Sequence, residues 1–247
     1  MKHVAVIISL ALSTMTTTQA SELKLIAGGS LAGLFNELGP QFEKASGHKL
    51  SIHFDSTPNI IARVNSGAAF DVAVVPVDVF KDAAAKGRFA PGPTIDIARV
   101  GYGVIVRAGA PKPDISTPDA FKKALLDAKS IASVPASAAG AYIAKVYERL
   151  GIGEDMKAKT RVQSGPTAIA PAVANGEAEL GIFLTNVFNT AGVELVGPFP
   201  ADLQQELLFA SAIAADARER DAAKALIDYL KTPAAIAAIK AAGMTPG

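Results

Sequence analysis

LKLIAGGSLAGLFNELGPQF, residues 23–42, places a strand, a turn and a helix in direct succession. The first four residues are mostly apolar and predict a strand, and Gly28-Gly29-Ser30 predicts a turn after it. The apolar residues beyond the turn recur at helical spacing: Leu31, Leu34, Phe35, Leu38 and Phe42. This strand–turn–helix order is the repeating unit of an α/β fold.

Similar units follow along the chain. Alternating apolar residues at 50–54 predict a strand, after which we expect Thr57 to cap a helix and Pro58 to open it. Residues 70–75 are apolar except for Asp71, as in a buried parallel strand. Further strands are expected at 100–106, 129–134, 160–163 and 180–184, and helices at 79–85, 119–128, 216–230 and 233–242. This alternation predicts a mostly parallel sheet with helices on both faces, and residues 96–107 and 197–213 are candidate crossover segments.

The N-terminus has the pattern of an export signal. Lys2 and His3 precede an apolar run at 4–12, a polar stretch follows, and Ala20 offers a small residue for cleavage. The alternative is a membrane anchor, but the apolar run is shorter than the roughly 20 residues that span a bilayer. We therefore expect residues 1–20 to be a signal peptide and the mature chain to be periplasmic.

The composition excludes several classes of protein and site. A 50% hydrophobic and 19% charged chain is a folded protein, and a net charge of +1 argues against a nucleic-acid partner. There is no cysteine, which excludes thiolate metal sites and cysteine nucleophiles. The histidines are His3, His48 and His53, and His3 lies in the predicted signal peptide. We therefore expect neither a metal nor a cofactor.

The informative motif is a set of small, hydroxyl-rich turns between a strand and a helix. They are Gly28-Gly29-Ser30, Asp55-Ser56-Thr57, Ser137-Ala138-Ala139-Gly140 and Ser164-Gly165-Pro166-Thr167. Free N–H groups and the helix dipole at such turns favour an anion, and the carboxyl ends of strands are where ligands bind in open α/β sheets. Each turn alone is also an ordinary helix cap. Together they predict a cradle for a small anion.

Each charged residue near these turns has two possible roles. Arg99 and Arg107, in the first crossover segment, would either hold a carboxylate or pair with acids on the surface. Asp55 would repel an anion unless its carboxylate turns away or accepts backbone N–H groups, and it is alternatively a general base in the cleft.

These turns, in this order behind a signal peptide, resemble the molybdate-binding proteins of ABC importers. The resemblance covers nearly the whole mature chain. It is carried by LIAGGSL at residues 25–31, by Ser56, Ile61-Ala62-Arg63 and Phe70-Asp71-Val72, by GEAELGI at 176–182 and by VELVGPFP at 193–200. Leu184 departs from it, because the family places a tyrosine near that position.

The resemblance implies a type II periplasmic-binding fold, in which two α/β lobes enclose a ligand cleft. Its lobes would comprise residues 21–98 with 206–247, and residues 99–205. Carried over by position, Ser30 and Ser56 would be ligands from the first lobe and Ala138, with Ser137, from the second. Thr167 would add a helix N–H. The cleft would further include Gly29, Thr57, Leu184 and Arg99. The implied protein is a monomer that hands its anion to an ABC permease.

A divergent branch of the same family, the aconitate isomerases, offers the alternative. Residues 106–114 and 148–152 are similar to that branch. On this interpretation the chain moves a double bond within a tricarboxylate, with Asp55 as the base and Arg107 as a carboxylate clamp. The leading expectation is an exported solute-binding protein for a small oxyanion or carboxylate.

Overall fold

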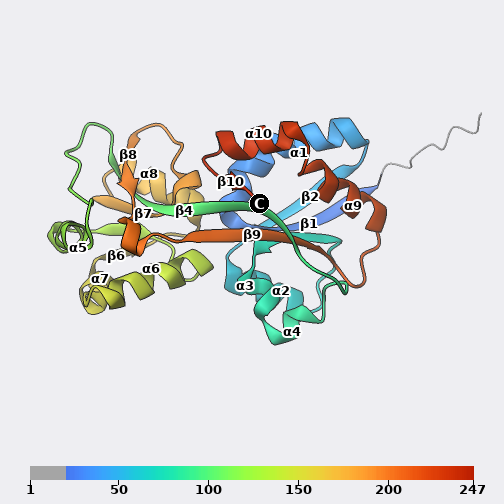
Figure 1. Ribbon diagram of the computed structural model, residues 1–247, viewed down its shortest axis with the longest axis horizontal. Coiled ribbons are helices and arrows are strands. Elements are labelled where there is room, and N and C mark those ends of the chain that lie inside the picture. The colour runs from blue at the N-terminus through green and yellow to red at the C-terminus, as the bar shows by residue number, and fades with distance from the viewer. Residues whose placement is uncertain (1–20) are drawn as a thin grey trace, which may run out of the picture.

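The computed structural model describes residues 21–247, where the chain folds into two α/β lobes joined by long strands (Figure 1). The α/β class and the two-lobe architecture are therefore confirmed. The predicted signal peptide, residues 1–20, lies outside the described residues. Within residues 21–247, no helix combines the length and hydropathy of a membrane span.

The elements follow the predicted alternation, but the sheet is mixed and not mostly parallel as predicted, because β4 and β9 pair antiparallel with their neighbours. The strands are β1 (Glu22–Gly28), β2 (Lys49–Asp55), β3 (Val72–Pro76), β4 (Ile95–Arg107), β5 (Ile131–Ser133), β6 (Thr160–Val162), β7 (Leu180–Leu184), β8 (Val193–Pro198), β9 (Glu206–Ile213) and β10 (Thr245–Pro246). The helices are α1 (Ala32–Ser46), α2 (Thr57–Asn65), α3 (Asp78–Lys81), α4 (Ala83–Lys86), α5 (Pro118–Asp127), α6 (Ala138–Arg149), α7 (Gly153–Lys159), α8 (Ile169–Ala174), α9 (Arg220–Tyr229) and α10 (Pro233–Ala241). Short 3₁₀ helices occupy Gly29–Leu31, Pro166–Ala168, Thr185–Val187 and Ala201–Leu203.

The first lobe has a sheet with helices on both faces. β1 lies between β2 and β3 and is parallel to both, and β9 runs antiparallel beside β3. Along β1, Leu25 points into the core shared with Phe35 of α1, whereas Ile26 points into a second core with Ile60 of α2. Burial of a side chain of this size contributes about 1.5–3 kcal/mol. The lobe is thus held together by two apolar layers.

Asp71, the polar residue in the predicted buried strand, has a structural role. It is 4% exposed, and its carboxylate accepts hydrogen bonds from the backbone N–H groups of Lys24, Arg218 and Glu219. These bonds tie the segment before α9 to β1. A buried carboxylate needs such partners, because an unpaired buried charge is costly.

The second lobe repeats the arrangement on a smaller sheet. β5 is parallel to β6 and β7, and β4 pairs antiparallel with β7 and β8. α6 and α7 lie on one side of this sheet and α8 on the other (Figure 1). Phe199 packs between two other aromatic rings, with ring centroids 4.9 Å from Phe121 and 5.6 Å from Tyr102.

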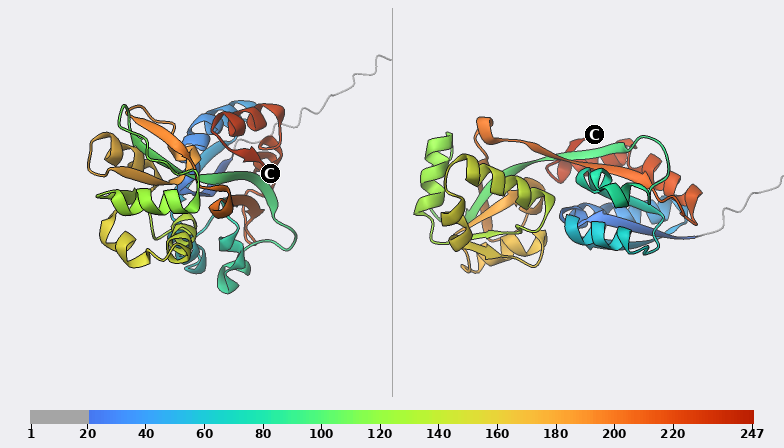
Figure 2. Two further views of the ribbon diagram at one scale, coloured as in Figure 1. Left: turned by 60° about the vertical axis from the view of Figure 1, so that its left-hand side comes forward. Right: turned by 90° about the horizontal axis from the view of Figure 1, so that it is seen from below.

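Two strands pass between the lobes. The first half of β4 pairs with β9, and the second half, from Tyr102 to Val106, pairs with β7. Figure 2 shows the lobes side by side with β4 and β9 running from one to the other. The predicted crossover at 96–107 is confirmed as β4. The second crossover is shorter than the predicted 197–213, because its strand, β9, begins at Glu206. The proposed lobe boundary at residue 98 falls within the continuous β4.

Local chemistry changes two of the predicted elements and adds a helix that was not predicted. Ser56, in extended conformation, is the N-cap of α2, and Thr57 is the first helical residue. The helix predicted at 79–85 is split at Asp82, whose carboxylate accepts the N–H groups of Ala84 and Ala85 and so starts α4. α7 was not predicted, although acidic residues in its first turn and lysines in its last turn suit the helix dipole.

Candidate ligand-binding cleft

Two adjoining cavities lie between the lobes. The smaller measures about 20 Å³, room for about one water molecule, and the larger about 640 Å³. Thr57, Ser137, Ala138 and Leu207 line both, so the two cavities form one cleft. The smaller is further enclosed by Gly28, Gly29, Ser30, Asp55, Ser56, Pro76, Val134, Ala139, Pro166, Phe183 and Leu184. Residues of all four predicted turns therefore meet here.

Two serine hydroxyls of the first lobe are available at the smaller cavity. Ser30 lies in the 3₁₀ helix after β1 and is 8% exposed. Ser56 caps α2 by position, but its hydroxyl makes no capping hydrogen bond. Among the described residues, neither hydroxyl has a hydrogen-bond partner. Both hydroxyls are therefore available to donate a hydrogen bond to a ligand.

The second lobe contributes main-chain donors to the same cavity. Ala138, the first residue of α6, donates its N–H to the hydroxyl oxygen of Thr57 across the cleft, at 3.2 Å. The Ser137 hydroxyl is already used, because it donates to the carbonyl of Val134 at 2.7 Å and accepts the N–H of Gly140 at 2.9 Å. Ser137 therefore orients the start of α6, and the N–H of Ala138 faces the first lobe.

The carboxylate of Asp55 is turned toward the start of α2. Its Oδ1 accepts the N–H of Ser56 and the side-chain amide of Asn59, both at 2.7 Å. Its Oδ2 lies 3.3 Å from His53 Nε2. Because the Asp55 carboxylate accepts a backbone N–H group, it can lie near a bound anion, as the sequence analysis required.

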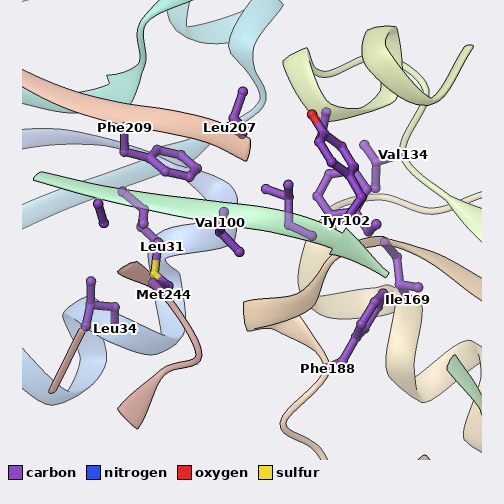
Figure 3. Packing of buried hydrophobic residues seen from close by; sticks show 14 of the residues in the cluster. Leu31, Leu34, Val100, Tyr102, Val134, Ile169, Phe188, Leu207, Phe209 and Met244 are labelled. Atoms are coloured by element: carbon purple, nitrogen blue, oxygen red, sulfur yellow. The ribbon is translucent and has the colours of Figure 1, made fainter. Parts of the chain in front are cut away.

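The larger cavity is also lined by residues that were not predicted from the sequence. Tyr102 of β4 forms part of its wall, together with Tyr142 and Lys145 of α6 and Lys81 of α3. Figure 3 shows Tyr102 on β4 at the side of the second lobe, near Val134. In the β4–β7 ladder, Tyr102 is the register partner of Leu184. Tyr102 lies in the predicted crossover segment 96–107, in which the sequence analysis considered only the two arginines.

Comparisons with known proteins find relatives that match nearly the whole length of the chain. The pattern that defines bacterial extracellular solute-binding proteins matches residues 23–245. An aconitate isomerase from Pseudomonas is 32% identical over 231 residues, which are 91% of this chain and 87% of that protein. The molybdate-binding protein ModA of Azotobacter vinelandii is 28% identical over 233 residues, 91% of this chain and 90% of that protein.

The chain belongs to the bacterial extracellular solute-binding protein family.

The solved structures agree with this assignment. The periplasmic molybdate-binding protein of Azotobacter vinelandii superposes with a TM-score of 0.75 at 23% identity, covering 90% of this chain and 98% of that chain. A tungstate-binding protein from Desulfovibrio alaskensis superposes with a TM-score of 0.63 at 14% identity, covering 92% and 99%. The family resemblance and the periplasmic-binding fold inferred from the sequence are confirmed.

The other predicted ligand residues of this solute-binding protein are unequally placed. Leu184, at the position of the family's tyrosine, is 1% exposed and lines the smaller cavity with an apolar side chain. Thr167 is exposed and does not line either cavity, whereas its neighbour Pro166 does. Gly29 lies between the two lobes, where an added Cβ would stand 3.4 Å from Pro166 and from the carbonyl of Asp55.

The structure does not bring Arg99 and Arg107 to the cleft of the solute-binding protein. Arg99 pairs with Asp96 at 2.7 Å, and β10 pairs beside it. Arg107 ends β4, and its guanidinium packs against Gly176. Both side chains lie outside the residues that line the two cavities. Arg107 is the last residue of β4, whereas Arg99 lies only three residues from Tyr102 but is held by Asp96 of the same strand.

Asn186 makes a contact between the lobes that sequence reasoning missed. From the 3₁₀ helix after β7, its Nδ2 donates to the carbonyl of Ser30 at 2.8 Å. Together with the bond between Ala138 and Thr57, this contact joins the two lobes of the solute-binding protein beside the smaller cavity. Its Oδ1 is buried without a partner among the described residues. Within residues 21–247, no group of three His, Asp or Glu side chains is arranged to hold a metal ion.

Proposed function

We propose that this solute-binding protein captures a small anion, an oxyanion or a carboxylate, between its lobes. The observation that carries the proposal is the pair of serines, Ser30 and Ser56, which line the smaller cavity and whose hydroxyls have no protein partner among residues 21–247. The starts of α2 and α6 meet at the same cavity and favour negative charge. The relatives named for molybdate and tungstate binding support the same class of ligand.

The proposed mechanism is closure of the lobes about β4 and β9. The N–H of Ala138 donates to the Thr57 hydroxyl across the cleft. A bound anion would take over this N–H, with the hydroxyls of Ser30, Ser56 and Thr57 as further donors and Gly29 allowing close approach. Specificity follows from the number of donors, because each one left unpaired in a dry cleft costs free energy.

The cellular setting is part of the proposal. Residues 1–20 direct export, the mature protein works in the periplasm, and its closed form docks on the permease of an ABC importer. The support is the N-terminal sequence pattern and the periplasmic molybdate-binding protein that shares the fold.

A thermal-shift titration of residues 21–247 tests the capture of an anion. The panel contains molybdate, tungstate, sulfate, phosphate, acetate and di- and tricarboxylates. A ligand at 100 times its Kd stabilises the folded state by about 2.7 kcal/mol. In a chain of this size that raises the Tm by roughly 5 to 10 °C. No stabilisation by any anion of the panel would overturn the proposal.

The second candidate function is isomerisation of aconitate, favoured by the 32% identity to an aconitate isomerase. Moving a double bond requires a group that removes a proton from one carbon and returns it to another. Three carboxylates line the cleft, those of Asp55, Asp78 and Glu206. Of the two residues first considered for this reaction, Asp55 lies in the cleft and Arg107 lies outside it.

Turnover is tested directly. Purified protein is incubated with cis-aconitate, and the trans isomer is followed by proton NMR. If the wild type forms trans-aconitate and Asp55→Asn does not, the protein is an isomerase and Asp55 is its base. Stabilisation by cis-aconitate without any conversion would leave capture as the function.

A further inference from the structure

The larger cavity holds polar groups that capture of one small anion leaves unused. It opens from the smaller cavity and measures about 640 Å³ against about 20 Å³. An anion bound at Ser30 and Ser56 would leave most of this space to water. The side chains of the larger cavity therefore indicate what else the ligand carries.

Tyr102 offers a hydroxyl to the larger cavity. The residue is 1% exposed and lines the cavity, and its hydroxyl has no hydrogen-bond partner among the described residues. Tyr142, beside it, differs, because its hydroxyl donates to the carbonyl of Leu203 at 2.8 Å. Burial raises the pKa of Tyr102 above its ordinary value, and the neighbouring Tyr142 and Asp78 raise it further. The phenol is thus a neutral donor without a protein acceptor.

One face of α6 connects the two cavities. Ala138, Ala141, Tyr142 and Lys145 follow one another at helical spacing, and all of them line the larger cavity. Ala138 also lines the smaller cavity. Two helical turns separate Ala138 from Lys145, about 10 Å along the axis, a distance that a lysine side chain shortens by reaching back. The same helix therefore supplies an N–H to one end of the cleft and an ammonium to the other.

The charges around the larger cavity single out Lys145. Lys81 is paired with Asp78 at 3.4 Å. Lys145 makes no ion pair within residues 21–247. The remaining acid of the cavity, Glu206, begins β9 and is exposed. Both acids lie near Tyr102, since Asp78 raises the pKa of Tyr102 and Glu206 is the register partner of the adjacent Gly101. A second anion beside Tyr102 therefore needs the positive charge of Lys145, which lines the same cavity.

We propose that Tyr102 and Lys145 form a second subsite, which binds a carboxylate at the far end of a ligand whose first anionic group lies at Ser30 and Ser56. The inference rests on the proposed capture of an anion and narrows the ligand to organic acids with two or more carboxylates. Tyr102 donates its hydroxyl to the distal carboxylate, and Lys145 neutralises its charge. Inorganic oxyanions would use the first subsite alone.

Calorimetric titration tests the second subsite with tricarballylate, a tricarboxylate without a double bond, and with molybdate and acetate as single anions. Tyr102→Phe and Lys145→Met each raise the Kd for tricarballylate roughly tenfold or more, since each removes a hydrogen bond to a charged group. The Kd values for molybdate and acetate change by less than about twofold. Tyr229→Phe and Lys224→Met, both on α9 and outside the cleft, are the matched controls.

The outcomes separate this inference from the proposed function. If both variants bind tricarballylate as the wild type does, while Ser30→Ala binds it more weakly, the second subsite is wrong and the capture of an anion stands. A wild-type protein that binds molybdate but no polycarboxylate also overturns the subsite. Tricarballylate binding that Ser30→Ala leaves unchanged overturns the proposed function, and binding of no anion overturns both.

Discussion

Ser56 in the first lobe and Ser137 in the second lobe occupy similar turns, but their hydroxyls have different roles. Both are the N-cap residue of a helix that follows a strand. The Ser137 hydroxyl caps α6 by accepting the N–H of Gly140, whereas the Ser56 hydroxyl makes no capping bond. At α2 the N–H of Ser56 itself is accepted by Asp55, the residue before it.

In these similar turns, the Ser56 hydroxyl is available to a ligand, whereas the Ser137 hydroxyl is used to cap its helix. Asp55 supplies a carboxylate at the beginning of α2, and Ser56 lines the smaller cavity with a hydroxyl that makes no capping bond. The second lobe has Pro135 and Ala136 before its serine, with no side chain that could accept an N–H, so the serine must act as the cap itself. The lobes therefore contribute different chemistry, with hydroxyls from the first and a main-chain N–H from the second.

Removing the two free hydroxyls is expected to have the largest effect. Ser30→Ala with Ser56→Ala should raise the Kd for the captured anion more than 100-fold, because two hydrogen bonds to a charged group contribute about 1.5–3 kcal/mol each. Calorimetric titration measures the change. Ser46→Ala with Ser66→Ala, whose hydroxyls donate to carbonyls of the first lobe, is the matched control. An affinity within about fivefold of the wild type would contradict the site.

A substitution in the second-lobe turn should instead reduce stability. A Cβ at Gly140 would collide with the carbonyls of Val134 and Pro135, so Gly140→Ala must shift the backbone at the start of α6. We expect a loss of about 1–3 kcal/mol in the free energy of unfolding, measured by urea denaturation. The control is Gly33→Ala in α1, where a Cβ meets nothing within 4 Å. Equal stability of the two variants would show that the second turn is not tightly packed.

The fold could be predicted because its signals are local. Apolar periodicity and turn residues predicted most strands and helices, since each lobe buries both faces of its sheet. The missed helix α7 is short and has one buried residue, Met156, so its apolar face is too small to produce a periodic signal. The break at Asp82 depends on a cap within an apolar run, where periodicity is uninformative.

The site could be predicted only in part. Ser30 and Ser56 were found because the turn pattern coincides with the cleft. Whether a serine hydroxyl is free depends on its neighbours, as Asp55 and Ser137 illustrate, and no pattern in a single turn reveals that. Arg99 was expected in the cleft, but it is paired with Asp96 three residues earlier on the same strand. Tyr102 and Asn186 depend on contacts between distant segments, which spacing along the chain does not contain.

Removal of the Ser137 hydroxyl is expected to have a smaller and purely structural effect. Ser137→Ala should lower the free energy of unfolding by about 1 kcal/mol, the usual cost of losing a helix cap. Anion affinity should change by less than about threefold, because the hydroxyl is bonded to Val134 and Gly140. Thr232→Ala, which removes the matching cap of α10, should cost a similar amount. A loss of affinity comparable to that of Ser56→Ala would make Ser137 a ligand after all.

The smallest effect on stability is expected at the contact between the lobes. Asn186→Ala removes the hydrogen bond to the Ser30 carbonyl, but it also removes a buried amide oxygen that has no partner within residues 21–247. Losing a hydrogen bond and losing an unsatisfied buried group have opposite signs and similar size, so the free energy of unfolding should change by less than about 1 kcal/mol.

The equilibrium between open and closed lobes should respond more clearly to the same change, because the bond between Asn186 and Ser30 exists only when the lobes meet. The chain has no cysteine, so Lys86→Cys on α4 and Asp155→Cys on α7 allow specific dye labelling of one lobe each. Energy transfer between the dyes should report a lower closed fraction in Asn186→Ala without ligand, and saturation with the captured anion should restore it. A closed fraction equal to that of the wild type would mean that the bond between Ala138 and Thr57 suffices to hold the free cleft shut.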